Sequence, residues 1–203
     1  MPRRHSPRSE NLRRALAQEA ARIMAEHGIQ DFGAAKRKAA DRLGIGLDGA
    51  LPSNVEVEQA LSEYQRLFGA ATHDASLRLQ RQVALRAMRS LAAFSPRLVG
   101  PVLAGTATEH SDVQLHLFTD QPESVALELI DRGVEHELAE SRLRLGAERF
   151  QSYPAVRFEL AEHMVEATVF PLDGIRQAPV SPVDGRPMRR ADAAEIEGLL
   201  SAS

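Results

Sequence analysis

Residues 97–118, RLVGPVLAGTATEHSDVQLHLF, decide the fold of this 203-residue chain. The apolar residues Leu98 and Val99 predict a short strand, and the glycines at 100 and 105 predict a turn after it. A second strand is expected to open at Ser111-Asp112. The stretch therefore predicts two strands joined by a glycine-bearing turn.

The same stretch resembles the signature of the nucleotidyltransferase superfamily typified by DNA polymerase beta. That signature reads Gly-Ser-x-Ala-x-Gly-x-Ala, a short spacer, and then Ser-Asp-(Ile/Val)-Asp-Leu. The positions that match without a gap are Gly100, Gly105, Ala107, Ser111, Asp112, Val113 and Leu115. Pro101 replaces the serine, and Gln114 replaces the second aspartate. The resemblance implies a nucleotidyltransferase-like mixed β-sheet flanked by helices and leaves the activity open.

Both replacements fall where the chemistry needs particular groups. Nucleotidyl transfer needs one or two Mg²⁺ ions that bridge phosphate oxygens, and Mg²⁺ is usually held by one or two carboxylates. Side chains alternate along a strand, so Asp112 and residue 114 are expected on one face. Pro101 removes a backbone N–H and a hydroxyl together, and Gln114 offers a carbonyl oxygen without charge. We therefore expect a Mg²⁺ site that is weak or absent.

The resemblance also implies a third carboxylate on a later strand. Glu166 is the candidate for this position, and Glu159 is a poorer one. The catalytic and metal-binding candidates are therefore Asp112 and Glu166, although Glu166 is equally well explained as a solvent-facing strand residue. His116 falls on the same face as Asp112, where a covered polar residue is expected rather than a ligand, because Mg²⁺ prefers oxygen. The nucleotide-binding positions implied by the resemblance are Gly100, Gly105, Thr106, Ser111 and Gln114.

Charge divides the chain into two parts. Residues 1–97 hold 16 Lys and Arg against 10 Asp and Glu, whereas residues 98–203 hold 9 against 18. A helical pattern stops at Ser95-Pro96, which places the boundary there. We predict a flexible basic tail at residues 1–8, a helical region at 9–96, and a nucleotidyltransferase-like domain at 97–203, which together make an α+β protein.

The helical region is predicted to contain four helices, at residues 10–27, 32–43, 55–68 and 75–94, with loops at 44–52 and 69–74. The first two resemble the start of a helix-turn-helix DNA-binding domain, with Lys36-Arg37-Lys38 on the second helix. A loop stands where the recognition helix should begin, so a two-helix packing unit with a basic solvent face is the simpler interpretation. The arginines at 78, 81, 86 and 89 form either a solvated helix face or a phosphate-binding row.

The remaining elements are read from alternation and caps. A helix is predicted at 124–131, a strand at 134–138, a hairpin of 155–160 with 163–170, and a final helix at 193–200 capped by Asp192. Residues 141–150 fit a strand or a helix. Ser181–Met188 is rich in turn residues and predicts a lid or a brace.

The order of these parts, with Asp31-Phe-x-x-Ala-Lys-Arg-Lys-Ala39 and Ser181-Pro-Val-Asp-Gly-Arg-Pro187, resembles a group of uncharacterised bacterial nucleotidyltransferase-like proteins. Three functions stay open. The first is a nucleotide or phosphate binder with a degenerate metal site, and the second is an active Mg²⁺-dependent nucleotidyltransferase that uses Asp112 and Glu166. The third is a nucleic-acid-binding or protein-interaction module built on the basic helical half.

Composition excludes several other classes. The chain has no cysteine, which excludes disulfides and thiolate chemistry. Its longest apolar run, at 98–107, is too short and too interrupted to span a bilayer, and Arg3-Arg4 is not followed by an apolar segment. We expect a soluble cytoplasmic protein without a secretion signal, and the sequence predicts no oligomeric state.

Overall fold

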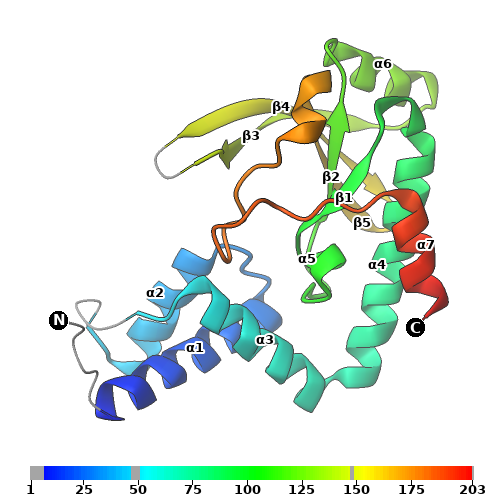
Figure 1. Ribbon diagram of the computed structural model, residues 1–203. Coiled ribbons are helices and arrows are strands. Elements are labelled where there is room, and N and C mark those ends of the chain that lie inside the picture. Colours follow the sequence, from blue (N-terminus) through cyan, green and yellow to red (C-terminus); the bar gives the residue numbers. More distant parts are fainter. Residues whose placement is uncertain (1–6, 47–50, 147–148, 203) are drawn as a thin grey trace. The chain divides into compact units, whose positions relative to one another are not determined.

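The structure, a computed structural model, describes residues 7–46, 51–146 and 149–202 in two compact units. The first unit comprises residues 1–74 with 108–110, and the second comprises 75–107 with 111–203. Residues 1–6 of the predicted tail, 47–50 of the predicted loop and 147–148 lie outside the described residues. The helices and strands of both units are labelled in Figure 1.

Three helices build the first unit, namely α1 (Pro7–His27), α2 (Phe32–Leu43) and α3 (Asn54–Phe68). Asp31 caps α2 by accepting a hydrogen bond from the Ala34 N–H. Ser53 caps α3, because Ser53 and Glu56 form a reciprocal capping box. The helix α1 also begins earlier than the predicted residue 10. The buried core of this unit is formed by Leu16, Ala17, Ala20, Ala21, Ile23, Met24, Ala35, Ala39, Ala40, Val57 and Leu61.

The helix α4 (Ala70–Ser90) begins directly after Gly69, so the predicted loop at 69–74 is wrong. Gly69 ends α3 by donating to the Gln65 carbonyl, and its own carbonyl accepts the His73 N–H of the next helix. The two helices are therefore separated by one glycine, whereas a loop of six residues was predicted. The helix ends at Ser90, and Ala92–Phe94 follows as a short 3₁₀ turn rather than as more α-helix.

Most of α4 packs in the second unit. Its residues Leu77, Ala84, Leu85 and Met88 share one core with the strands of the sheet. The boundary proposed at residue 96 from charge therefore falls inside the second unit, since packing continues back along α4.

The sheet of the second unit has five strands in the order β1-β2-β5-β4-β3. The strands are β1 (Arg97–Val99), β2 (Val113–Phe118), β3 (His136–Arg144), β4 (Phe150–Leu160) and β5 (His163–Phe170). The pair β2 and β5 is parallel, and the other three pairs are antiparallel. This mixed sheet with flanking helices confirms the predicted α+β class.

The two faces of the sheet differ in chemistry. One face is apolar and shares a hydrophobic core with α4, α6 (Glu123–Asp131) and α7 (Ala193–Ser201). These three helices are labelled in Figure 1. The strand residues of that core are Leu98, Val113, Leu115, Leu117, Val156, Phe158, Val165, Ala167 and Val169. The opposite face carries polar and aromatic residues, because side chains alternate along each strand. The candidate site lies on this second face.

Two further points complete the fold. The predicted cap of the last helix is confirmed, since Asp192 accepts a hydrogen bond from the Glu195 N–H. A 3₁₀ turn, η2 (Leu172–Arg176), follows β5. Within the described part of the chain, no helix combines the length and apolar character that crossing a membrane requires.

Candidate functional site

The glycine-bearing turn of the signature forms a short helix, α5 (Gly100–Ala104), between β1 and β2. Gly100 and Gly105 adopt φ values of 72° and 86°, the left-handed region that favours glycine. The N–H groups of Gly105 and Thr106 both donate to the Pro101 carbonyl, at 2.8 and 3.0 Å. Gly105 and Thr106 were predicted to bind the nucleotide, but here their N–H groups close the turn on itself.

Gln114, at the position of the second aspartate, packs against Gly100. The two lie near each other because Val99 pairs with Gln114 in the β1–β2 register. A Cβ atom added to Gly100 would overlap the side-chain oxygen Oε1 of Gln114. The Gln114 amide therefore fills the space above the glycine.

Three side chains form one row across the polar face of the sheet. Gln114 pairs with Glu166 between β2 and β5, and Glu166 pairs with Arg157 between β5 and β4. Asp112 immediately precedes β2 and joins this row through Arg157. The sheet thus brings the two proposed carboxylates together, with an arginine that the sequence analysis did not single out.

The Arg157 guanidinium lies between the two carboxylates. Its Nη2 is 3.4 Å from Asp112 Oδ2, and its Nε is 3.8 Å from Glu166 Oε2. Ser141 adds a hydroxyl 3.4 Å from Glu166 Oε1. Charge-assisted hydrogen bonds are usually about 2.7–2.9 Å long, so these contacts are loose. Arg157 Nε is buried and has no hydrogen-bond partner within the described part of the chain, which leaves the guanidinium incompletely satisfied.

This arrangement does not fit the Mg²⁺ ion that the resemblance implies. The guanidinium supplies the positive charge between Asp112 and Glu166, and the Gln114 oxygen is directed at Gly100. The described residues also contain no group of three or more His, Cys, Asp or Glu side chains that could hold a metal ion. The site is therefore a bridged pair of carboxylates rather than an open oxygen cage.

Ser111 has a structural position. It is buried, and its carbonyl accepts a hydrogen bond of 3.3 Å from Nε2 of Gln80, a fully buried residue of α4. This contact ties the entry of β2 to the helix. Ser111 was predicted to bind the nucleotide, and no pattern in the sequence pointed to Gln80.

Only one of the four α4 arginines reaches the turn. Arg81 Nε donates to the Val102 carbonyl at 3.3 Å. Arg78 bonds to the Leu200 carbonyl, Arg89 pairs with Glu197 at 2.7 Å, and Arg86 is exposed. Arg78 and Arg89 thus contact α7 through these bonds, and the phosphate-binding row of all four arginines stays a prediction.

A second buried cluster lies further along the polar face, around Arg190. Its Nε donates to His116 Nδ1 at 3.0 Å, and its Nη1 donates to the Gly174 carbonyl at 2.8 Å. The guanidinium also lies 4.9 and 5.0 Å from the ring centroids of Phe118 and Phe170. These contacts fasten the segment before α7 to the sheet.

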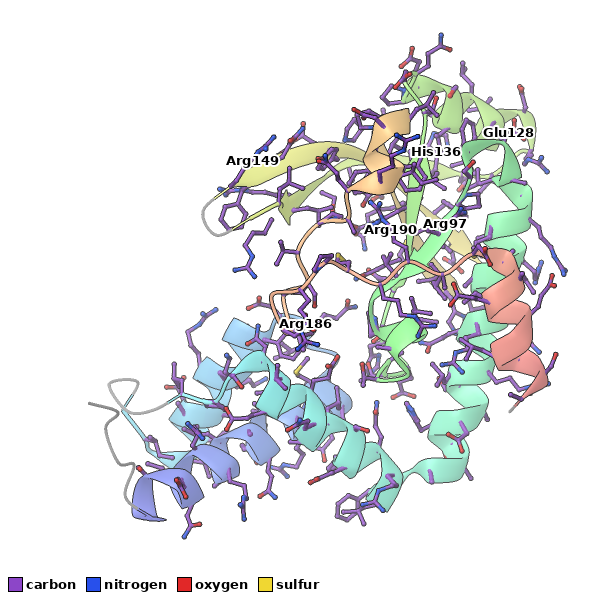
Figure 2. The ribbon with its side chains drawn as sticks, viewed as in Figure 1. Arg97, Glu128, His136, Arg149, Arg186 and Arg190 are labelled. Atoms are coloured by element: carbon purple, nitrogen blue, oxygen red, sulfur yellow. The ribbon has the colours of Figure 1, made fainter. Side chains whose placement is uncertain are left out.

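The titration of this cluster follows from its burial. Burial and, to a smaller extent, the Arg190 charge lower the pKa of His116 to about 3. His116 is thus neutral and accepts the Arg190 hydrogen bond through Nδ1. Burial, followed by repulsion from Arg97, lowers the pKa of Arg190 to about 10, and the two arginines lie close together in Figure 2. The expectation of a covered polar residue at 116 is confirmed.

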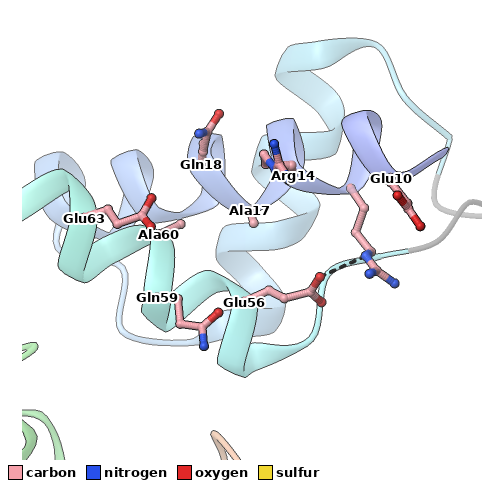
Figure 3. A pocket seen from close by; sticks show the side chains of 9 residues that line it. Glu10, Arg14, Ala17, Gln18, Glu56, Gln59, Ala60 and Glu63 are labelled. Carbon is pink, nitrogen blue, oxygen red and sulfur yellow. Dashed lines mark ion pairs between the residues drawn. The ribbon is translucent and has the colours of Figure 1, made fainter. Parts of the chain in front are cut away.

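The first unit carries a shallow groove of about 280 Å³ between α1 and α3 (Figure 3). Its lining mixes charges, and Arg13 Nε pairs with Glu56 Oε1 at 2.9 Å. Other cations of this unit are also held, since Arg22 and Arg42 both pair with Glu19.

Lys36 of the predicted basic helix face is held in the same way. Its ammonium donates to the Pro52 carbonyl and to Asn54 Oδ1. Several cations of the first unit therefore already have carboxylate or carbonyl partners within that unit.

Arg157 could have been found from the sequence. The predicted turn at Ala161-Glu162 fixes the pairing of Leu160 with His163, and counting back places Arg157 opposite Glu166. The Arg190 contacts had no such signal, because they join a loop to the sheet.

Comparison with known proteins identifies no family. No family model matches the chain, and no curated protein matches it significantly. One solved structure that matches is Cid1, described as having RNA terminal uridylyl transferase activity. The match has 20% identity and a TM-score of 0.26, and it covers 53% of this chain and 30% of the Cid1 chain. Similarity this low supports no conclusion about fold or function.

Proposed function

We propose that this chain is a nucleotidyltransferase-like protein that binds a nucleotide or phosphate and has lost metal-dependent transfer. The signature residues support the first part, because they lie on α5, on β2 and in the segment that joins these two elements. One observation carries the second part, namely the Arg157 guanidinium between Asp112 and Glu166.

The physical reason is the difference between a guanidinium and a metal ion. Both neutralise two carboxylates, but Mg²⁺ keeps coordination positions for phosphate oxygens and for the attacking group. A guanidinium offers only N–H donors in one plane. Arg157 thus stabilises the carboxylates and supplies no position at which the reacting oxygens meet.

The runner-up is an active Mg²⁺-dependent nucleotidyltransferase. It is favoured by the closeness of Asp112 and Glu166 to one guanidinium and by the partial exposure of both side chains. In that function Arg157 would leave the carboxylates when a metal–nucleotide complex binds. A nucleic-acid module on the helical half has weaker support, since several of its cations are paired or hydrogen-bonded within the unit.

A transfer assay with α-labelled nucleoside triphosphates separates the two. Each of the four nucleotides is supplied with Mg²⁺ or Mn²⁺, and label is measured on the protein, on added RNA and on small acceptors. Wild type, Asp112→Ala and the control Glu159→Ala are compared, and nucleotide binding is measured by calorimetry. We expect binding without any label that depends on Asp112. Label that Asp112→Ala abolishes and Glu159→Ala retains would establish the active enzyme instead.

A further inference from the structure

Arg81 is a cation placed against the signature turn, with no acidic partner among the residues that the structure describes. It extends from α4, where its Nε donates to the Val102 carbonyl of α5 at 3.3 Å. Its Nη2 lies 3.7 Å from the position of a Cβ on Gly105. The guanidinium therefore lies beside the second glycine of the turn.

The charge of Arg81 is poorly compensated. The side chain is half-buried, and none of the described carboxylates lies within 4 Å of it. A buried cation without a counter-charge is costly, and one carbonyl offsets only part of that cost. Burial lowers the pKa of Arg81, and the nearby charge of Arg189 lowers that pKa further.

The neighbouring groups do not relieve this imbalance. Asp112 and Glu166 are already bridged by Arg157, and Arg189 pairs with Glu195 at 2.9 Å. Within the described residues, Arg81 makes a hydrogen bond only through Nε, so both Nη groups are available to a ligand. An anion at the turn would satisfy these donors and reduce the repulsion between Arg81 and Arg189.

We propose that Arg81 binds a phosphate group of the nucleotide at the α5 turn, an inference that rests on the proposed function. A guanidinium forms two parallel hydrogen bonds to phosphate, which matches the two available Nη groups. The N–H groups of Gly105 and Thr106 are engaged with Pro101, so the arginine replaces them as donor. Asp112 and Glu166 carry two negative charges and Arg157 offsets one of them, so this pair repels phosphate. The phosphate therefore binds beside Arg81 and not beside the two carboxylates.

Calorimetry on the full chain tests this assignment. The probes are the four nucleoside triphosphates and inorganic tripolyphosphate, each with EDTA so that no metal contributes. The variants are Arg81→Gln, Arg81→Lys and the control Arg86→Gln, whose residue is exposed on the same helix. We expect Arg81→Gln to weaken binding about tenfold or more, which is the size of a lost hydrogen bond between charged groups. Arg81→Lys should lose less, and Arg86→Gln should stay within about twofold of wild type.

Each outcome has a separate meaning. Nucleotide binding unchanged in Arg81→Gln overturns the role of Arg81 and leaves the proposed function standing. Binding of tripolyphosphate alone, lost in Arg81→Gln, supports the phosphate site and contradicts a nucleotide function. No binding of any probe to wild type overturns both. Circular dichroism and thermal unfolding of each variant identify a loss of binding that is caused by misfolding. If Arg81→Gln misfolds, Arg81→Lys tests the role of Arg81 in its place, and unchanged binding in a folded Arg81→Lys would overturn it.

Discussion

Arg157 and Glu166 face each other across the β4–β5 hairpin, with the arginine Nε 3.8 Å from Glu166 Oε2. The pairing is set by a two-residue turn, Ala161 and Glu162, whose φ values are 50° and 64°. Positive φ at both turn positions matches the twist of the two strands. The bridge over the carboxylates is thus fixed by local backbone geometry.

Removing Arg157 should open a cation site. In Arg157→Gln the carboxylates of Asp112 and Glu166 lose their counter-charge, so their affinity for a divalent ion rises. We expect Mn²⁺ binding, measured by electron paramagnetic resonance, to be at least about tenfold tighter than in wild type, a change of about 1.4 kcal/mol. Arg142→Gln, on β3, is the control. Equal Mn²⁺ affinity in wild type and Arg157→Gln, or a gain that survives adding Asp112→Asn, would contradict the bridge.

Gly100 should tolerate no side chain. In Gly100→Ala the new Cβ would meet Gln114 Oε1, and the φ of 72° is unfavourable for alanine. We expect the free energy of unfolding in urea to fall by about 1–3 kcal/mol. Gly198→Ala, in α7 with open space around it, should be neutral or stabilising. Adding Gln114→Ala should recover part of the loss, and a full loss in that double variant would rule out the Gln114 contact.

His116 should make stability depend on pH. Its pKa is about 3 in the folded protein against an ordinary value of 6.5, so only the unfolded chain binds this proton between those pH values. The free energy of unfolding should therefore fall as the pH falls from about 6.5 toward 3, with a slope of up to about 1.4 kcal/mol per pH unit. His116→Asn keeps an acceptor for Arg190 and should flatten this slope. Parallel curves for wild type and His116→Asn would refute the assignment.

Arg190 should not be replaceable by lysine. An ammonium retains the charge but cannot donate to His116 and Gly174 together while stacking on Phe118 and Phe170. We expect Arg190→Lys to lower the free energy of unfolding by about 2 kcal/mol. Arg186→Lys, an exposed change in the same segment, should have little effect (Figure 2). Similar urea midpoints for the two variants would show that Arg190 contributes by charge alone.

The elements that the sequence predicted well are those with a local signal. The β4–β5 hairpin and α7 with its Asp192 cap were found because alternation and capping act over a few residues. The strand β3 was predicted at 134–138 but runs over His136–Arg144. Its residues alternate only between half-buried and exposed, with none buried, so no alternation of apolar and polar residues in the sequence marks its length.

The candidate site was predicted in part. The resemblance singled out Asp112 and Glu166, which both contact the Arg157 guanidinium, and Gln114, which pairs with Glu166 in the sheet. The contact of Arg81 with α5 and the closure of the turn on Pro101 depend on tertiary packing. No spacing in the sequence reports such contacts.

The parallel pairing of β2 with β5 has a consequence for the order of folding. Val113 pairs with Val165, about fifty residues later, whereas β3, β4 and β5 are joined as successive antiparallel neighbours. Closing the longer loop costs more entropy, so we expect the three neighbouring strands to assemble before β2 joins them. A nascent chain that has emerged only to residue 150 contains the whole signature stretch but neither Arg157 nor Glu166. The carboxylate pair and its bridging cation therefore come together only after β4 and β5 have been synthesised.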